Sequence, residues 1–160
     1  MSYFKNSAIL ALVLAMPLGL ARGSEEQGHH GQDESSANGI PGDMNKPSRL
    51  VAVSMREGDG KMLFVPDAVT VAKGEQIHFQ LRNDGELEHE FVLGTAEEFA
   101  EHAEKMKAPD TMHRGPNAVL LGPKASGDLV WKFTTPGDFE FACLIPGHLE
   151  AGMKGKVVVK

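Results

Sequence analysis

The sequence predicts an all-β fold, a sandwich or barrel, for most of its 160 residues. Three observations support this prediction. Apolar and polar side chains alternate along short segments, as at Ile77, Phe79 and Leu81, which is the pattern of a half-buried strand. Turn residues such as Gly58-Asp59-Gly60 separate these segments at short intervals. Six or more such strands with frequent turns are typical of a β-sandwich or barrel.

The expected strands follow one another from Arg49 to the end of the chain. They cover residues 51–53, 62–65, 68–72, 77–81, 89–93, 129–133, 139–143 and 155–160. Because side chains alternate between the two faces of a strand, His89 should share one face with Phe91 and Leu93, and Cys143 should share one with Phe139 and Phe141.

One segment has the spacing of a helix. Thr95 and Glu98 form a capping-box pattern at its start. Phe99, Ala103 and Met106 then recur at helical spacing, and Pro109 follows. We therefore expect one short helical insert at about residues 95–107.

The N-terminus has the pattern of a secretory signal peptide. Lys5 precedes an apolar run from Ala8 to Leu20, which is too short to span a bilayer as a helix. Small residues then allow cleavage after Ala21 or Gly23. We expect residues 1–23 to be removed and the protein to be periplasmic; a retained membrane anchor is the alternative.

Residues 24–48 are rich in Gly, Ser, Asp, Glu and Asn and carry almost no large apolar side chains. Such a segment buries too little apolar surface to offset its ordering entropy. The predicted organisation is therefore a signal peptide at 1–23, a flexible acidic tail at 24–48 and one β-domain at 49–160.

The charge of the chain excludes one class of partner. Removal of residues 1–23 takes away Lys5 and Arg22, which moves the formal net charge from −6 to −8. No basic stripe remains to neutralise phosphates, so nucleic acid is not an expected partner. We also expect no membrane association after cleavage of the signal peptide.

The chain has one cysteine, Cys143. An exported protein with a single cysteine forms no internal disulfide, and a free thiol in an oxidising compartment is a liability. Either the thiol is buried and inert, or something binds its sulfur.

The residues around Cys143 favour the second alternative. Cys143, His148 and Met153 are separated by four residues each, in a loop between two expected strands, and His89 begins another strand. Two imidazoles, a thiolate and a weak axial thioether form the ligand set of a type 1, electron-transferring copper site. Each residue alone is as easily explained as core or surface. Zinc is the rival metal, but a structural zinc site takes four strong ligands, and a thioether is a poor one.

These segments resemble the cupredoxins, the small blue-copper proteins, from Arg49 to Lys160. The resemblance rests on Phe64-Val-Pro66, on the segment from Val69 to Phe79, on His89-Glu-Phe-Val-Leu93 and on the loop from Cys143 to Met153. The gap between Cys143 and His148 is similar to that of rusticyanin and longer than that of plastocyanin. The ligand strand and loop are most similar to the periplasmic cupredoxins of bacterial copper-resistance systems.

The resemblance implies a Greek-key β-sandwich with one copper ion. It implies that His89 is the buried ligand and that Met153 tunes the reduction potential. It also implies that His148 lies nearest to solvent, within an apolar patch of Leu144, Ile145, Pro146 and Leu149 where a redox or copper-handling partner docks. Several cupredoxins have Asn after the first histidine, where this chain has Glu90. That departure puts any backbone lock made by the Asn in doubt.

Other histidines and methionines offer a second, more exposed copper site. His102 and Met106 lie four residues apart on the expected helix, and Met112 and His113 follow it. His29, His30 and Met44 lie in the expected tail and form a candidate copper-capturing arm. The alternative for both groups is ordinary solvated or packed side chains.

The sequence thus predicts a monomeric periplasmic copper protein with one-electron Cu(I)/Cu(II) chemistry, serving copper tolerance or handling. The alternative is a diffusible electron carrier between respiratory partners. We do not expect an enzyme: nitrite reductases and multicopper oxidases need further histidine-rich copper sites, and a binuclear oxidase centre needs two cysteines. A Cu(I)-oxidising activity at the same centre stays open as an alternative.

Overall fold

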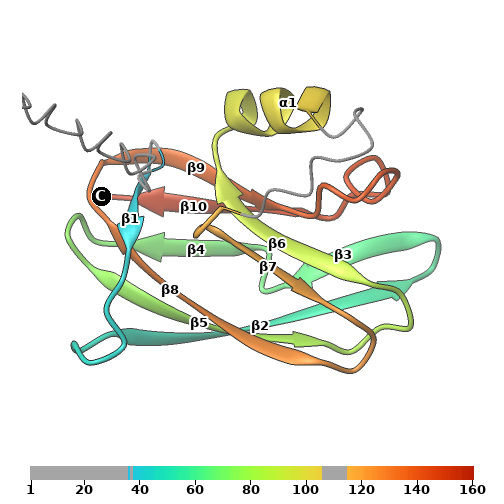
Figure 1. The fold of residues 1–160 in the computed structure, drawn as a ribbon, viewed down its shortest axis with the longest axis horizontal. Coiled ribbons are helices and arrows are strands. Elements are labelled where there is room, and N and C mark those ends of the chain that lie inside the picture. Colours follow the sequence, from blue (N-terminus) through green and yellow to red (C-terminus); the bar gives the residue numbers. More distant parts are fainter. Residues whose placement is uncertain (1–35, 37, 106–114) are drawn as a thin grey trace, which may run out of the picture. The chain divides into compact units, whose positions relative to one another are not determined.

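The structure is a computed structural model that describes residues 36, 38–105 and 115–160. These residues form two five-stranded sheets, with strand orders β1-β8-β5-β2-β3 and β4-β10-β9-β6-β7 (Figure 1). The strands are β1 (Gly39–Pro41), β2 (Arg49–Gly58), β3 (Lys61–Val65), β4 (Ala68–Val71), β5 (Gln76–Asn83), β6 (His89–Gly94), β7 (Ala118–Leu121), β8 (Ser126–Phe133), β9 (Gly137–Ala142) and β10 (Lys154–Val159). The predicted all-β sandwich is confirmed.

The core lies between the two sheets, because the alternating apolar residues of both turn inward. Ile77, Phe79 and Leu81 of β5 are fully buried, as the period-two pattern predicts. Aromatic rings join the sheets: Phe64 and Phe79 contact Phe91, with ring centroids 5.7 and 5.2 Å apart. Offset and edge contacts of this kind add to the free energy gained by burial.

Two strand pairs are parallel and join distant parts of the chain. β2 pairs with β5, and the C-terminal strand β10 pairs with β4. On its other side β10 pairs antiparallel with β9. The last strand of the chain therefore lies inside its sheet, between β4 and β9, and not at an edge.

The predicted helical insert is confirmed as α1 (Ala96–Lys105). Its capping box is reciprocal: the Glu98 amide donates to Thr95 Oγ1 at 3.1 Å, and the Thr95 amide donates to the Glu98 carboxylate at 2.6 Å. Phe99 packs with Val92 of β6 and Ala142 of β9. Because α1 covers this outer face and the core covers the inner face, every residue of β6 is buried.

Part of the predicted flexible tail at 24–48 is ordered in the structure, which differs from the prediction. Residues 39–41 form β1, which pairs antiparallel with β8. Asn38 is fully buried and accepts a 2.9 Å hydrogen bond from the indole N–H of Trp131. Gly39 permits this contact, since a Cβ there would overlap the Lys132 carbonyl oxygen. Ordered structure therefore begins before Arg49, held by hydrogen bonds that apolar composition does not reveal.

Several predictions fall on residues outside those described, namely the signal peptide, His29, His30, Met106, Met112 and His113. Among the helices of the described residues, none is long and apolar enough to cross a membrane.

Candidate metal centre

His89 is the first residue of β6, and a tightly bonded turn delivers it to the core. Asn83, at the end of β5, is fully buried. Its side-chain amide donates to the carbonyl oxygens of Leu87 at 2.7 Å and of Leu121 at 3.0 Å. The turn between β5 and β6 is therefore tied to the end of β5, which is tied in turn to the end of β7. The His89 side chain that follows this turn is fully buried.

Cys143 directly follows β9, and the loop that it begins folds back on itself. The Cys143 amide donates to the Met153 carbonyl oxygen at 3.1 Å, and the Met153 amide donates to the His148 carbonyl oxygen at 3.0 Å. Gly147 and Gly152 have φ angles of 87° and 96°, a region that side chains with a Cβ disfavour. These turns bring Cys143, His148 and Met153 to one end of the sandwich.

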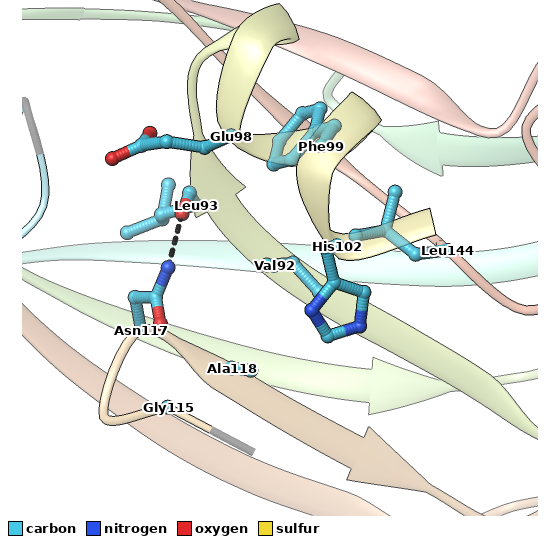
Figure 2. Close-up of a pocket in the computed structure, with 9 residues that line it drawn as sticks. All are labelled: Val92, Leu93, Glu98, Phe99, His102, Gly115, Asn117, Ala118 and Leu144. Atoms are coloured by element: carbon cyan, nitrogen blue, oxygen red, sulfur yellow. Dashed lines mark hydrogen bonds between the residues drawn. The ribbon is translucent and has the colours of Figure 1, made fainter. Parts of the chain in front are cut away.

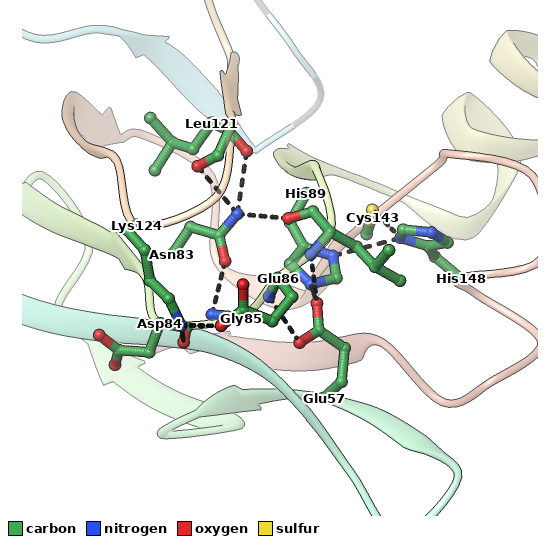
Figure 3. A network of polar contacts seen from close by, with 12 residues as sticks. Glu57, Asn83, Asp84, Gly85, Glu86, His89, Leu121, Lys124, Cys143 and His148 are labelled. Atoms are coloured by element: carbon green, nitrogen blue, oxygen red, sulfur yellow. Dashed lines mark hydrogen bonds and ion pairs between the residues drawn. The ribbon is translucent and has the colours of Figure 1, made fainter.

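The loop and β6 place three donor atoms together. His148 Nδ1 lies 3.2 Å from His89 Nδ1 and 3.3 Å from Cys143 Sγ. The ligand atoms of His89, Cys143 and His148 all lie within 4.8 Å of one another, and all three residues are buried (Figure 3). Met153 is also fully buried. The structure thus brings together the three nitrogen and sulfur donors that the sequence singled out.

The surroundings of the Cys143 sulfur suit a metal-bound thiolate. Burial raises the pKa of the Cys143 thiol, and the backbone amides of Glu90 and Ile145 partly oppose this by donating toward the sulfur. The Glu90 amide lies 3.3 Å from Sγ. A cation bound to the sulfur would supply the missing counter-charge. For His148, burial lowers the pKa, with a further contribution from His89, which favours the neutral imidazole that binds metals.

The second ring nitrogen of His89 contacts a residue from the opposite sheet. His89 Nε2 lies 2.6 Å from Oε1 of Glu57 on β2. Partial burial by itself would raise the pKa of Glu57. Hydrogen bonds from the amides of Glu86 and Leu87 and from His89 outweigh that effect and hold the pKa below its usual value. The sequence analysis did not identify Glu57, because its local sequence pattern is the same as that of other acidic residues on strands.

The donor set fits copper. Three buried donor atoms lie within 4.8 Å of one another, an arrangement that a cation between them would stabilise. One soft thiolate with two imidazoles is the set that type 1 copper takes, and the thioether of Met153 lies at the end of the same loop.

The extra candidate ligands are not brought together among the described residues. Met44 is 64% exposed and lies beyond β1. His102 projects from α1 and lines a cavity of about 60 Å³ with Glu98, Phe99, Val92 and Leu144 (Figure 2). The second copper site therefore stays a prediction.

Comparisons with known proteins agree with this geometry. Residues 51–160 match the model of the family described as copper binding proteins, plastocyanin/azurin family. The chain is 46% identical over 155 residues to the copper-resistant cuproprotein CopI of Rubrivivax gelatinosus, covering 96% of this chain and 92% of that protein.

Two further relatives extend the likeness. CopI of Pseudomonas aeruginosa is 35% identical over 175 residues, covering 89% of this chain and 92% of that protein. Among solved structures, dithionite-reduced auracyanin of Roseiflexus castenholzii is similar in fold, with a TM-score of 0.58 and 23% identity over 72% of this chain and 99% of that one. The chain therefore belongs to the plastocyanin/azurin family of copper-binding proteins, the cupredoxins.

Proposed function

We propose that this chain is a periplasmic type 1 copper protein that serves copper tolerance. One copper ion would be held by His89, Cys143 and His148, with the thioether of Met153 as a weaker donor. The bound copper supplies one-electron chemistry between Cu(I) and Cu(II). The protein acts by binding and electron transfer and not as an enzyme, since the domain at 49–160 has five histidines, and the three besides His89 and His148 offer few ligands for a further catalytic copper site.

The convergence of His89, Cys143 and His148 in the core is the observation that carries the copper chemistry. Each residue has a distinct task in holding the metal. Cys143 supplies the sulfur and is supported by the Glu90 amide. His89 supplies a fully buried nitrogen, and His148, 8% exposed, supplies the one nearer to solvent.

Sequence similarity to copper-resistance proteins along nearly the whole chain supports the proposed role in copper tolerance. The proteins that match 96% and 89% of this chain are both described as copper-resistant cuproproteins. The tolerance role follows if this chain shares the physiology of those relatives. Export to the periplasm rests on the signal-peptide pattern of residues 1–23.

A diffusible electron carrier is the second candidate, and one feature of the structure favours it. Leu144, Ile145 and Leu149 are half-buried around His148, and Pro146 is exposed. A small apolar surface next to the ligand nearest solvent suits brief docking of a redox partner.

Gene deletion with complementation separates the two roles. We expect the deletion strain to grow poorly as copper in the medium is raised, and we expect rescue by the wild type but not by Cys143→Ser. His78→Gln is the matched histidine control, since His78 pairs with Asp128 on an outer face and should rescue fully. Normal copper sensitivity combined with a respiratory defect in copper-replete medium would favour the carrier instead.

A further inference from the structure

The contact between Glu57 and His89 links the opposite sheet to the metal centre. Glu57 lies near the end of β2, and His89 lies on β6 in the other sheet. Their side chains meet at 2.6 Å, between Glu57 Oε1 and His89 Nε2. An ionised carboxylate only accepts hydrogen bonds, so the hydrogen resides on Nε2. In the neutral ring this leaves the lone pair on Nδ1, the atom that faces His148.

The Glu57 carboxylate is itself held firmly in place. The Glu86 amide donates to Oε2 at 3.0 Å, and the Leu87 amide donates to Oε1 at 3.1 Å. These two amides belong to the same turn that delivers His89 to the core (Figure 3). The carboxylate is therefore anchored by two backbone amides of one turn as well as by His89.

Gly85 makes room for this arrangement. A Cβ at residue 85 would overlap both oxygens of the Glu57 carboxylate. The Gly85 amide donates to Asn83 Oδ1 at 2.9 Å, so the buried Asn83 side chain fixes the backbone at this point. The turn thus supplies two backbone amides that donate to the Glu57 carboxylate, and its glycine leaves space for that carboxylate.

The β2–β3 hairpin also contacts the ligand loop. Met62, opposite Glu57 in the β2–β3 register, donates its amide to the Ala151 carbonyl oxygen at 3.2 Å. One hairpin therefore contacts both the first histidine and the loop that carries the other candidate ligands.

We propose that Glu57 is a positioning residue for the copper centre: it fixes the His89 tautomer with Nδ1 free for the metal and strengthens that nitrogen as a donor to Cu(II). This inference rests on the proposed function. A carboxylate that accepts the outer N–H of a ligating imidazole raises the basicity of the ring, and loss of such a partner typically costs about 10–100-fold in metal affinity. The oxidised ion, with the higher charge, gains more from the stronger donor than Cu(I) does.

Glu57→Gln tests the inference, with Glu88→Gln as the matched control. Glu88 is an exposed carboxylate next to His89 in sequence, and its removal takes away the same charge without the hydrogen bond. We expect Glu57→Gln to weaken Cu(II) binding about 10–100-fold and Cu(I) binding less. The reduction potential should then rise by about 59 mV for each tenfold difference between the two affinities. Glu88→Gln should change the potential much less.

Gly85→Ala is an independent variant that keeps the charge of Glu57 and displaces its carboxylate. It should also raise the reduction potential. If Glu57→Gln does not fold, the potential of Gly85→Ala tests the role of the Glu57 carboxylate instead. Imidazole ¹⁵N spectra of the copper-free protein give a readout without the metal: we expect His89 as the Nε2–H tautomer in the wild type and a tautomer mixture in Glu57→Ala.

A potential in Glu57→Gln equal to that of the wild type or of Glu88→Gln would overturn the inference, as would an unchanged tautomer in Glu57→Ala. These results would leave the proposed function intact, because the wild type would still bind copper and show the visible absorption of thiolate-to-copper charge transfer. A wild type without that absorption would contradict the proposed function itself.

Discussion

The backbone amide of Glu90 lies 3.3 Å from the sulfur of Cys143 and directs its hydrogen toward it. The residue after the first histidine differs from the Asn found in several cupredoxins, but this contact uses the main chain and does not depend on the side chain. Cys143 is thus held from β6 as well as from its own loop, in a position to bind a metal between His89 and His148.

The Cys143 sulfur should produce an intense visible absorption when Cu(II) is bound, through thiolate-to-copper charge transfer. We expect Cys143→Ser to abolish this band, because a hydroxyl oxygen does not replace the covalent copper–sulfur bond. Titration with Cu(II), followed by visible absorption, measures it. A band that survives the substitution would refute the assignment of the site.

Met153→Leu should retain copper and raise the reduction potential, because loss of the weak sulfur donor disfavours Cu(II) more than Cu(I). The change conserves volume, so the cost in unfolding free energy should stay below about 1.5 kcal/mol. Met55→Leu is the matched control, since Met55 is an equally buried methionine of β2. Voltammetry of both variants gives the comparison; loss of copper from Met153→Leu would instead assign Met153 a structural role in the loop.

Copper uptake at pH 7 should release the proton of the Cys143 thiol. Burial raises the pKa of the Cys143 thiol, so the copper-free protein carries S–H, which the metal must displace. The pKa of His148 is lowered by burial, so this ring is already neutral and releases none. Apparent Cu(II) affinity should therefore rise about tenfold per pH unit above neutrality until the thiol ionises. Calorimetry in buffers of different ionisation enthalpy counts the protons, and a count of zero would mean that a thiolate is already present.

Asn38→Ala should lower the free energy of unfolding by about 1–3 kcal/mol, because the buried Trp131 N–H loses its acceptor. Asn45→Ala, at an exposed position, should change it by less than about 0.5 kcal/mol. Urea denaturation of the two variants tests the docking of residues 38–41. Equal stability of Asn38→Ala and the wild type would show that this segment adds little.

The sequence predicted the parts of this molecule that have a local pattern. Alternation placed the strands and the buried faces of Phe79 and Trp131, and the Thr95–Glu98 capping box located the helix. The close spacing of Cys143, His148 and Met153, together with the lone cysteine, indicated the candidate donors. The fold brings Cys143 and His148 together with His89, and the role of Met153 stays a prediction.

Two features depend on contacts between distant residues and had no local pattern. Glu57 meets His89 only because β2 and β6 face each other across the core. β1 pairs with β8 through backbone hydrogen bonds, and residues 24–48 have too few large apolar side chains to predict a strand. Hydrogen bonds of this kind depend on the tertiary structure and cannot be predicted from amino-acid composition.

The position of β10 determines how the ligand loop is closed. The loop from Cys143 to Met153 ends where Lys154 pairs with Ala142, and β10 completes its sheet only by inserting between β9 and β4. The geometry of the loop donors therefore depends on a strand that follows all of them in the sequence and pairs with two neighbours. A chain that ends before Lys154 would contain all four candidate ligands but would lack the strand that closes their loop, so we expect it not to hold copper in this geometry.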